Sequence, residues 1–372
     1  MSGGTWSSAP SMAEPRAFAV FAQLGNGKIV AATNANGGTA LAEVLEDGVW
    51  SAIDSFPFTT DAEQGIGVVA STAGNGDLVL LLGNSAVRLN KSTLAWNRIT
   101  LGMPHAHFRF AGVQLDSGDV LAIAGYQVLI SSTLTAECHA FHPADDTYTL
   151  RSSLSAARAY HAAVMLTGDQ HVLVAGGLLS GGVTATCERS TGKTATAWAS
   201  AASMATARRS HGLLNLADGD VLAIGGMDSG GSALASVERY DADGDSWSTV
   251  APMSETRSFI TPLLLPDGTV FVSGGYHDPD AGTRISAELY DPVADEWTAL
   301  TDMSVARAGH GVLLVNSDPI QVQVIGGENW TEEVDEYVAA SEVWSPDAAP
   351  TIAVVPPIII SPLGGGAGFG VD

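Results

Sequence analysis

Short apolar runs separated by turn-forming residues make up most of this chain. In residues 211–253 the run HGLLNL is followed by the turn Asp218-Gly219 and then by VLAIGG, ASVERYD and SWSTVAPM. Short apolar runs joined at Asp-Gly or Asn-Gly are typical of β-strands in hairpins. The second run is apolar at nearly every position, which predicts a strand covered on both faces. The segment therefore predicts a sheet of four short strands stacked between other sheets.

This four-strand pattern repeats along the chain with a period of about 50 residues. Each clear copy has an arginine, a Gly-Gly pair, an acidic-aromatic stretch such as VERYD, and a Trp followed by a Met. The arginines are Arg158, Arg208, Arg257 and Arg307, and the tryptophans are Trp198, Trp247, Trp297 and, near the start of the chain, Trp6. With three less regular copies, seven repeats begin near residues 16, 61, 107, 158, 208, 257 and 307.

The seventh repeat lacks its fourth strand, because no Trp-to-Met segment follows ASEVWSPDAAP. The missing segment is present at the other end of the chain, in TWSSAPSM at residues 5–12. Arg16 follows Met12 at the same interval as Arg257 follows Met253. We therefore expect residues 5–12 to complete the seventh sheet and to close a ring without exposed sheet edges.

The repeated motif resembles the kelch repeat, and most closely the bacterial kelch type related to the propeller of galactose oxidase. The resemblance covers about residues 5–349 and is most specific in the fourth to seventh repeats. It implies an all-β fold, a seven-bladed β-propeller over residues 1–349 whose last blade is closed by the N-terminal strand. Residues 350–372 form an apolar tail rich in Pro and Gly beyond the ring.

Residues that recur in every repeat are expected to hold the blades together. The arginines should pair with the third-strand glutamates Glu188, Glu238, Glu288 and Glu342, or with backbone carbonyls near the crossing from one blade to the next. The Trp and Met side chains should fill the wedge between sheets. The histidines that follow three of these arginines, His161, His211 and His310, should point around the ring, so no metal site is expected. Cys138 follows Arg109 at the same interval as Cys187 follows Arg158, which predicts equivalent places on neighbouring blades and two free thiols.

The net charge of −24 disfavours binding to nucleic acid or to an anionic membrane surface. No uninterrupted apolar stretch is long enough to span a membrane. The first residues have no basic region followed by an apolar run, so we expect no signal peptide and synthesis in the cytoplasm. This leaves the final location open, including incorporation into a virion or another extracellular particle.

The resemblance to galactose oxidase also raises the question of catalysis. That enzyme's copper site takes two tyrosines, two histidines and a cysteine cross-linked to one of the tyrosines. No set of residues in this chain matches it, and no other catalytic signature stands out. We therefore predict no catalytic residues and no cofactor.

Binding residues are expected on the two long loops that do not follow the repeat, residues 276–284 and 328–340. Tyr276, His277 and Trp330 offer stacking surfaces, and Asp278, Glu332 and Glu333 offer hydrogen-bond acceptors. Aromatic side chains beside carboxylates suit a glycan or a basic patch on a protein.

The sequence thus favours a non-enzymatic recognition propeller over two alternatives. In this interpretation residues 350–372 dock on other chains of an assembly, and the loop face binds a glycan or protein receptor, as in a virion-associated adhesin or decoration protein. The first alternative is a carbohydrate-active or oxidase-like enzyme with its site at the propeller mouth. The second is an intracellular kelch scaffold that binds one protein partner.

Overall fold

A computed structural model describes residues 4–24, 26–32, 42–53, 70–72, 76–82, 85–100, 107–127, 133–278, 282–317, 319–330 and 335–347 of the chain. All regular secondary structure within these residues is β-strand. In this part of the chain no helix has the length and apolar character needed to cross a membrane. Residues 350–372, the expected docking tail, lie outside the described residues.

Seven antiparallel sheets of four strands make up the fold. The first three are β2 (Val20–Gln23), β3 (Ile29–Ala32), β4 (Ala42–Glu46) and β5 (Val49–Ala52); β6 (Ala70–Thr72), β7 (Leu78–Leu82), β8 (Ser85–Leu89) and β9 (Trp96–Thr100); and β10 (Ala111–Gln114), β11 (Val120–Tyr126), β12 (Leu134–His142) and β13 (Thr147–Arg151). The next two are β14 (Ala162–Met165), β15 (Val172–Ala175), β18 (Cys187–Ser190) and β19 (Trp198–Ala201); and β20 (Gly212–Asn215), β21 (Val221–Ile224), β22 (Val237–Asp241) and β23 (Ser246–Val250). The last two are β24 (Leu263–Leu264), β25 (Val270–Ser273), β28 (Ala287–Asp291) and β29 (Glu296–Ala299); and β30 (Gly311–Ser317), β31 (Ile320–Ile325), β34 (Ser341–Ser345) and β1 (Thr5–Ala9).

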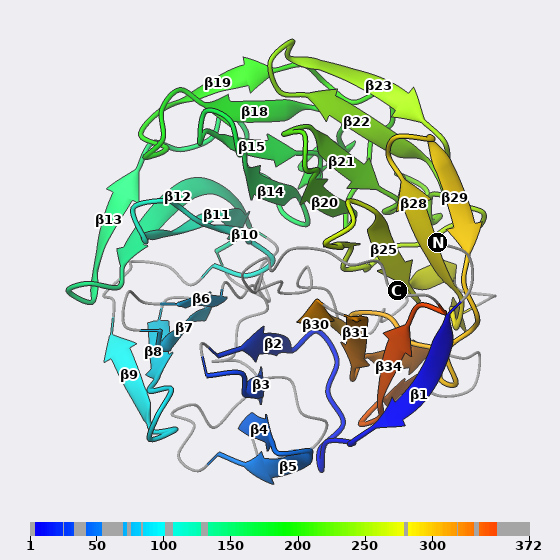
Figure 1. The fold of residues 1–372 in the computed structure, drawn as a ribbon. Helices are drawn as coiled ribbons and strands as arrows, with labels where there is room; N and C mark the ends of the chain where they lie inside the picture. The colour runs from blue at the N-terminus through cyan, green and yellow to red at the C-terminus, as the bar shows by residue number, and fades with distance from the viewer. Residues whose placement is uncertain are drawn as a thin grey trace.

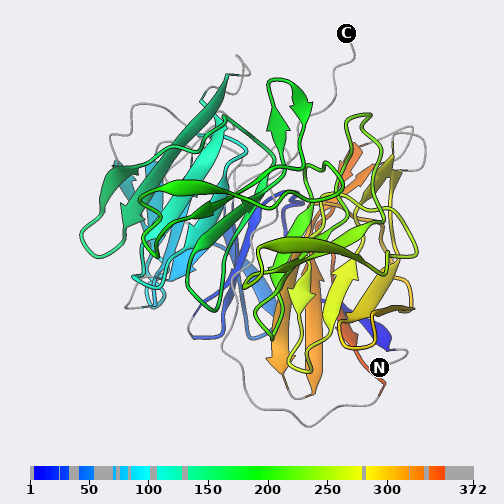
Figure 2. The same cartoon turned by 90° about the horizontal axis from the view of Figure 1, so that it is seen from above.

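The sheets stand around a central axis as the blades of a propeller, with the first strand of each blade nearest the axis (Figure 1). Three two-stranded hairpins connect the second and third strands of their blades: β16 (Leu178–Leu179) with β17 (Gly182–Val183), β26 (Tyr276–Asp278) with β27 (Gly282–Thr283), and β32 (Glu328–Trp330) with β33 (Asp335–Tyr337). Figure 2 shows the β16–β17 hairpin standing above one face of the disc. The prediction of a seven-bladed, all-β propeller is confirmed.

The N-terminal strand closes the last blade, as the repeat pattern predicted. β1 pairs antiparallel with β34, from Thr5 opposite Ser345 to Ala9 opposite Ser341. The Trp6 indole donates a hydrogen bond to the Thr301 carbonyl of the neighbouring blade at 2.7 Å. Both ends of the propeller sequence therefore meet in one sheet.

The hydrophobic core is divided into one cluster at each interface between adjacent blades. The repeated methionines occupy these clusters: Met12 packs between the last and first blades, and Met204, Met253 and Met303 pack at three other interfaces. The second strands β3, β15, β21 and β25 are buried at every position, which agrees with their continuous apolar sequence.

Backbone contacts between blades explain the repeated Gly-Gly pairs. The Gly226 N–H donates to the Arg257 carbonyl of the next blade at 2.8 Å, and Gly225 has a φ of 60°. A Cβ at Gly225 would lie only 2.3 Å from that carbonyl oxygen. Glycine is therefore required where one blade's backbone reaches the next.

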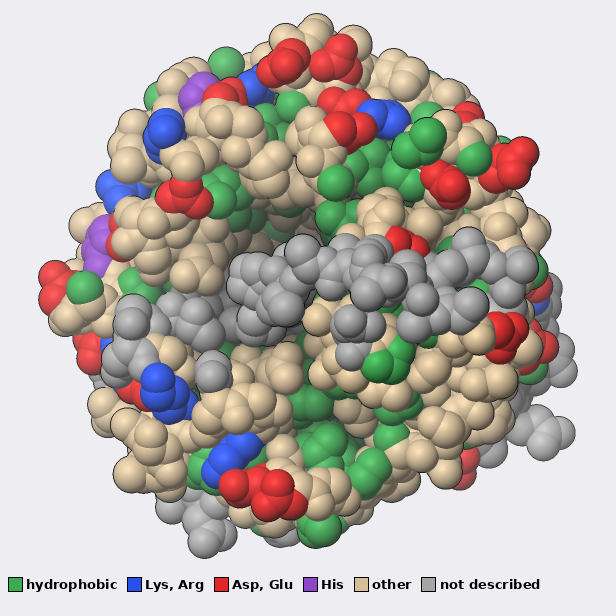
Figure 3. Space-filling view, in the orientation of Figure 1, with side chains coloured by type: hydrophobic (Ala, Val, Ile, Leu, Met, Phe, Trp, Pro, Cys, Tyr) green, Lys and Arg blue, Asp and Glu red, His purple; other side chains and the backbone are tan. Residues whose placement is uncertain are grey.

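On the face of the disc that Figure 3 shows, most charged side chains lie toward the rim. In the view along the axis in Figure 3, acidic and basic side chains are spread around the outside of the disc, and hydrophobic side chains gather nearer the centre. A binding surface near the axis would therefore differ in character from the acidic rim.

Candidate functional site

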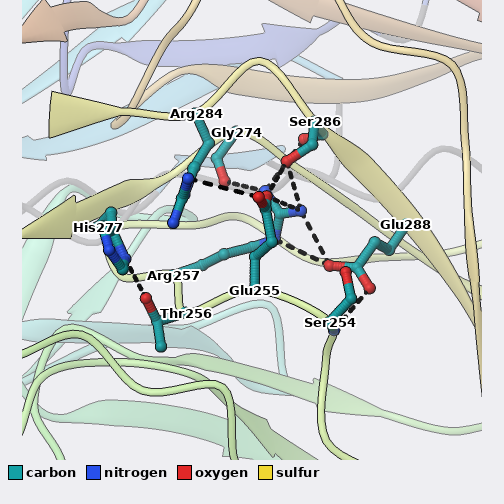
Figure 4. A network of polar contacts seen from close by, with 9 residues as sticks. All are labelled: Ser254, Glu255, Thr256, Arg257, Gly274, His277, Arg284, Ser286 and Glu288. Carbon is teal, nitrogen blue, oxygen red and sulfur yellow. Dashed lines mark hydrogen bonds and ion pairs between the residues drawn. The ribbon is translucent and has the colours of Figure 1, made fainter. Parts of the chain in front are cut away.

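A buried arginine–glutamate ion pair ties the start of a blade to its third strand. It occurs in five blades at N–O distances of 2.7 to 3.2 Å, as Arg16–Glu43, Arg158–Glu188, Arg208–Glu238, Arg257–Glu288 and Arg307–Glu342. The arginines are at most 1% exposed. Figure 4 shows Arg257 between the Gly274 carbonyl, at 2.7 Å, and Glu288. These arginines belong to the frame of the propeller, because no ligand could reach them.

A chain of backbone hydrogen bonds runs from blade to blade around the axis. Its members lie two residues after the place of the repeated arginine, and each has a positive φ. The N–H groups of Tyr160, Ser210, Phe259, Gly309 and Phe18 donate to the carbonyls of Arg109, Tyr160, Ser210, Phe259 and Gly309, respectively, at 2.8 to 3.2 Å. The backbone is thus the same in each of these blades while the side chain changes from blade to blade.

These backbone hydrogen bonds show that Arg109 is not equivalent to the repeated arginines. The interval to Cys138 places Arg109 with the repeated arginine Arg158, but Arg109 lies at the ring position of Tyr160. Arg109 is therefore not one of the frame arginines and lies at the level of the backbone ring.

Two arginines and two tyrosines gather beside the ring of backbone hydrogen bonds around the axis. The guanidinium carbons of Arg109 and Arg209 lie 5.1 and 5.5 Å from the centre of the Tyr160 ring. Tyr126 contacts the same ring edge-on, with the ring centres 6.0 Å apart. We call Arg109, Arg209, Tyr126 and Tyr160 the mouth cluster. Arginine stacked on aromatic rings at close range keeps its charge and its hydrogen-bond donors.

Arg109 is the most constrained member of the mouth cluster. Its side chain is buried, with the residue 4% exposed, and its Nε and Nη1 atoms have no hydrogen-bond partner in the described part of the chain. Burial lowers the pKa of Arg109, and the neighbouring Tyr160 and Tyr126 oppose that shift. Within the same residues no carboxylate forms an ion pair with Arg109 or Arg209. The arrangement is suited to receive an anionic group.

Two hairpins form an aromatic wall near the mouth cluster. β26–β27 and β32–β33 are joined by a hydrogen bond of 2.8 Å between Thr283 Oγ1 and Asn329 Oδ1. The Tyr276 and Trp330 rings meet edge to face at 4.6 Å, and Tyr337 packs on the same apolar cluster. Tyr337 also lies close enough to Arg109 to affect its pKa. The aromatic wall therefore lies within electrostatic range of the mouth cluster.

The predicted ligand residues have different positions in this arrangement. Tyr276 is buried and supports the partly exposed Trp330. His277 points to the Thr256 hydroxyl, with which it forms a hydrogen bond, beside the Arg257 network in Figure 4. The Asp278 side chain, Glu332 and Glu333 lie outside the described residues.

The mouth cluster was not identified from the sequence, although a signal was present. Arg209 directly follows the repeated Arg208, and Tyr160 lies two residues after Arg158, at positions where the repeats differ. Variable positions beside an invariant one indicate residues that are free to serve a ligand. The tertiary contacts were needed to show that these positions meet.

Three histidines that directly precede the innermost strands, His161, His211 and His310, are buried. Desolvation, together with the charge of Arg158, lowers the pKa of His161 to about 3, and desolvation with Arg307 does the same for His310. The pKa of His211 is also lowered, by burial and by Arg208. The His310 Nε2 atom lies 2.9 Å from the Ser273 hydroxyl. These histidines are therefore neutral parts of the core.

The free energy of unfolding is expected to fall as the pH drops from about 6.5 toward 3. In this range the histidines of the unfolded chain bind protons, whereas the buried histidines of the folded protein stay neutral. His310→Gln removes one such proton and should reduce the slope of unfolding free energy against pH by about 1.4 kcal/mol per pH unit in this window. Urea unfolding at several pH values measures the slope. The same substitution at the partly exposed His171 is the control, and an unchanged slope in His310→Gln would contradict the prediction.

The copper site implied by the resemblance to galactose oxidase does not fit these residues. Both cysteines are free and buried, and their thiols donate to the carbonyls of Ala136 and Ala185. Burial raises the pKa of Cys138 to about 12 and that of Cys187 to about 11, so neither is a ready thiolate. No cysteine is therefore placed to modify a tyrosine of the mouth cluster.

Comparisons with known proteins support the repeat and the fold. The kelch motif family matches residues 208–254. Kelch-like protein 15 of Danio rerio is 33% identical over 69 residues, which are 18% of this chain and only 11% of that protein. A solved fungal alcohol oxidase of the AA5 family, in complex with copper, matches 92% of this chain and 76% of its own at a TM-score of 0.70 and 15% identity. At this identity the likeness extends to the fold alone.

Proposed function

We propose that this chain, a seven-bladed propeller of kelch repeats, is a protein-binding module that receives an acidic side chain of its partner at the mouth cluster. The observation that carries the proposal is the buried Arg109, whose Nε and Nη1 donors have no partner within the described residues. A buried guanidinium without a carboxylate is costly, and a carboxylate of the partner would balance its charge and accept from one of these open donors.

The surroundings of Arg109 support a protein partner. Arginine, tyrosine and tryptophan are the residues most enriched at the energetic centres of protein interfaces. The mouth cluster supplies two arginines and two tyrosines, and the aromatic wall supplies Trp330 and Tyr337. Against a net charge of −24, Arg109 and Arg209, which form no ion pair with any described residue, are a local concentration of positive charge that can select an acidic segment.

A displayed library of 12-residue peptides tests this proposal with the whole chain as bait. We expect the selected peptides to share an Asp or Glu. Arg209→Ala and Arg109→Gln should each weaken binding of a selected peptide by about 2–5 kcal/mol, the usual cost of removing one partner from a desolvated charge pair. Isothermal titration calorimetry measures the change, and binding should weaken as salt is added.

The matched control is Arg189→Ala on β18. Arg189 pairs with Asp169 away from the mouth, so its loss should leave peptide affinity unchanged. Selected peptides without acidic residues, or equal binding by wild type and Arg209→Ala, would refute the proposed site. A glycan is the second candidate for this surface, because the partly exposed Trp330 can stack on a sugar. Binding on a glycan array that depends on Trp330 and not on Arg209 would favour it.

A further inference from the structure

The third blade lacks the arginine–glutamate pair found in five of the other blades. His107 takes the place of the arginine: its Nδ1 lies 2.9 Å from the Ala124 carbonyl oxygen, as Arg158 Nη1 lies 3.0 Å from that of Gly176. Ala124 and Gly176 are equivalent, since each follows four buried residues of the second strand and has a positive φ.

His139 takes the place of the glutamate in the same blade. Ala122 of β11 pairs with His139 of β12, just as Val174 of β15 pairs with Glu188 of β18. Glu137 precedes His139 by two residues on the same strand, so both side chains lie on one face of the sheet. An ion pair has thus been replaced by two histidines and a carboxylate.

The three side chains converge on a common space. One ligand atom from each lies within 4.8 Å of the others. The Nε2 atoms of His107 and His139 are 3.8 and 3.5 Å from Glu137 Oε2. These distances are longer than hydrogen bonds. They are close to the separation of about 3.3 Å that two ligands have around a tetrahedral zinc ion.

We propose that His107, Glu137 and His139 bind a divalent transition-metal ion of the zinc type. Two imidazoles and one carboxylate are a ligand set that zinc accepts, with a fourth position left for water. The Nδ1–H of His107 is held by the Ala124 carbonyl, which directs Nε2 toward the site. A backbone acceptor behind a ligating histidine is typical of metal centres.

Burial and access also suit a bound ion. His107 and His139 are 1% and 2% exposed, while the Glu137 side chain is 33% exposed and gives a route from solvent. The ion would link the segment before β10, which contains His107, to strand β12, which contains Glu137 and His139. It would do in this blade what the arginine–glutamate pair does in the others, so its role is to stabilise the seam.

Purified full-length protein, stripped with a chelator and dialysed, is titrated with Zn²⁺ by calorimetry and by thermal unfolding. We expect one ion per chain and a higher melting temperature with Zn²⁺. Glu137→Gln and His139→Ala should weaken Zn²⁺ binding at least about 100-fold, since even residues behind the ligands alter affinity 10–100-fold.

The decisive variant is the double substitution His107→Arg and His139→Glu, which restores the pair of the other blades. It should fold, lose Zn²⁺ binding and have a melting temperature that does not respond to the ion. His142→Gln is the control, because His142 lies on the same strand as His139 but outside the cluster, where it contacts Asp119 at 2.8 Å. No stoichiometric Zn²⁺ binding in wild type, or undiminished binding in the double variant, overturns the proposal and leaves a metal-free polar cluster.

Discussion

Removing residues 1–12 is expected to lower the free energy of unfolding by about 5 kcal/mol or more. The deletion takes away β1, which pairs with β34 over five residues, and Met12, which is 4% exposed between the last and first blades. Loss of a buried methionine side chain alone costs about 2–5 kcal/mol. Since domains have only about 5–15 kcal/mol in total, much of the chain should be unfolded at 37 °C. Denaturant unfolding followed by tryptophan fluorescence measures the loss.

Two comparisons distinguish ring closure from a general effect of truncation. Removing residues 1–3 leaves β1 intact and should not change stability. A synthetic peptide of residues 1–12 added to the truncated chain should restore part of the lost stability by pairing with β34. A truncated chain as stable as the full one would contradict the view that β1 closes the ring.

Glu238→Gln is expected to destabilise the protein by about 3–5 kcal/mol, the usual cost of leaving a buried charge without its partner. Glu238 accepts from Arg208 at 2.7 Å and from the backbone N–H of Ala205 and Thr206, so one carboxylate holds both a side chain and the crossing between blades. The Arg208 side chain is 0% exposed and cannot turn to water. Urea unfolding of the purified variant measures the loss.

A control in the same blade separates the buried pair from a surface one. Asp218→Asn breaks the ion pair between Asp218 and Arg239. The Asp218 side chain is 53% exposed, so the loss of stability should be at most about 1 kcal/mol. If Glu238→Gln cost no more than Asp218→Asn, the buried pairs would not be the frame of the propeller. The double variant Arg208→Met with Glu238→Leu should cost less than Glu238→Gln, because no buried charge is left unpaired.

Neighbouring residues of one repeat have different contacts in the fold. Arg208 is fixed by Glu238, whereas the adjacent Arg209 lies over Tyr160 of the neighbouring blade. A repeated residue that holds the blade therefore lies beside a variable residue that we propose as a contact for the partner. This arrangement allows binding residues to change without loss of the fold.

Several structural features could be predicted from the sequence because they rest on local patterns. The pairing of β1 with β34 followed from the Trp and Met spacing, and the burial of β21 followed from its continuous apolar run. The aromatic contact between Tyr276 and Trp330 lay within the two loops singled out. The alignment of Arg109 was wrong because the connections between strands differ in length from blade to blade, and only strand pairing fixes which residues are equivalent.

The sequence by itself determined the period, the four-strand unit, the closure of the ring and the all-β fold, because each depends on spacing along the chain. Only the tertiary structure decided which side chains meet at the axis and within the third blade. Arg109, Tyr160 and Arg209 are separated by about 50 residues at each step. They come together only because the blades converge on one axis, where backbone hydrogen bonds place successive repeats side by side. His107, Glu137 and His139 converge for a different reason, within one blade: His107 contacts the Ala124 carbonyl on β11, and β11 pairs with β12, which carries Glu137 and His139.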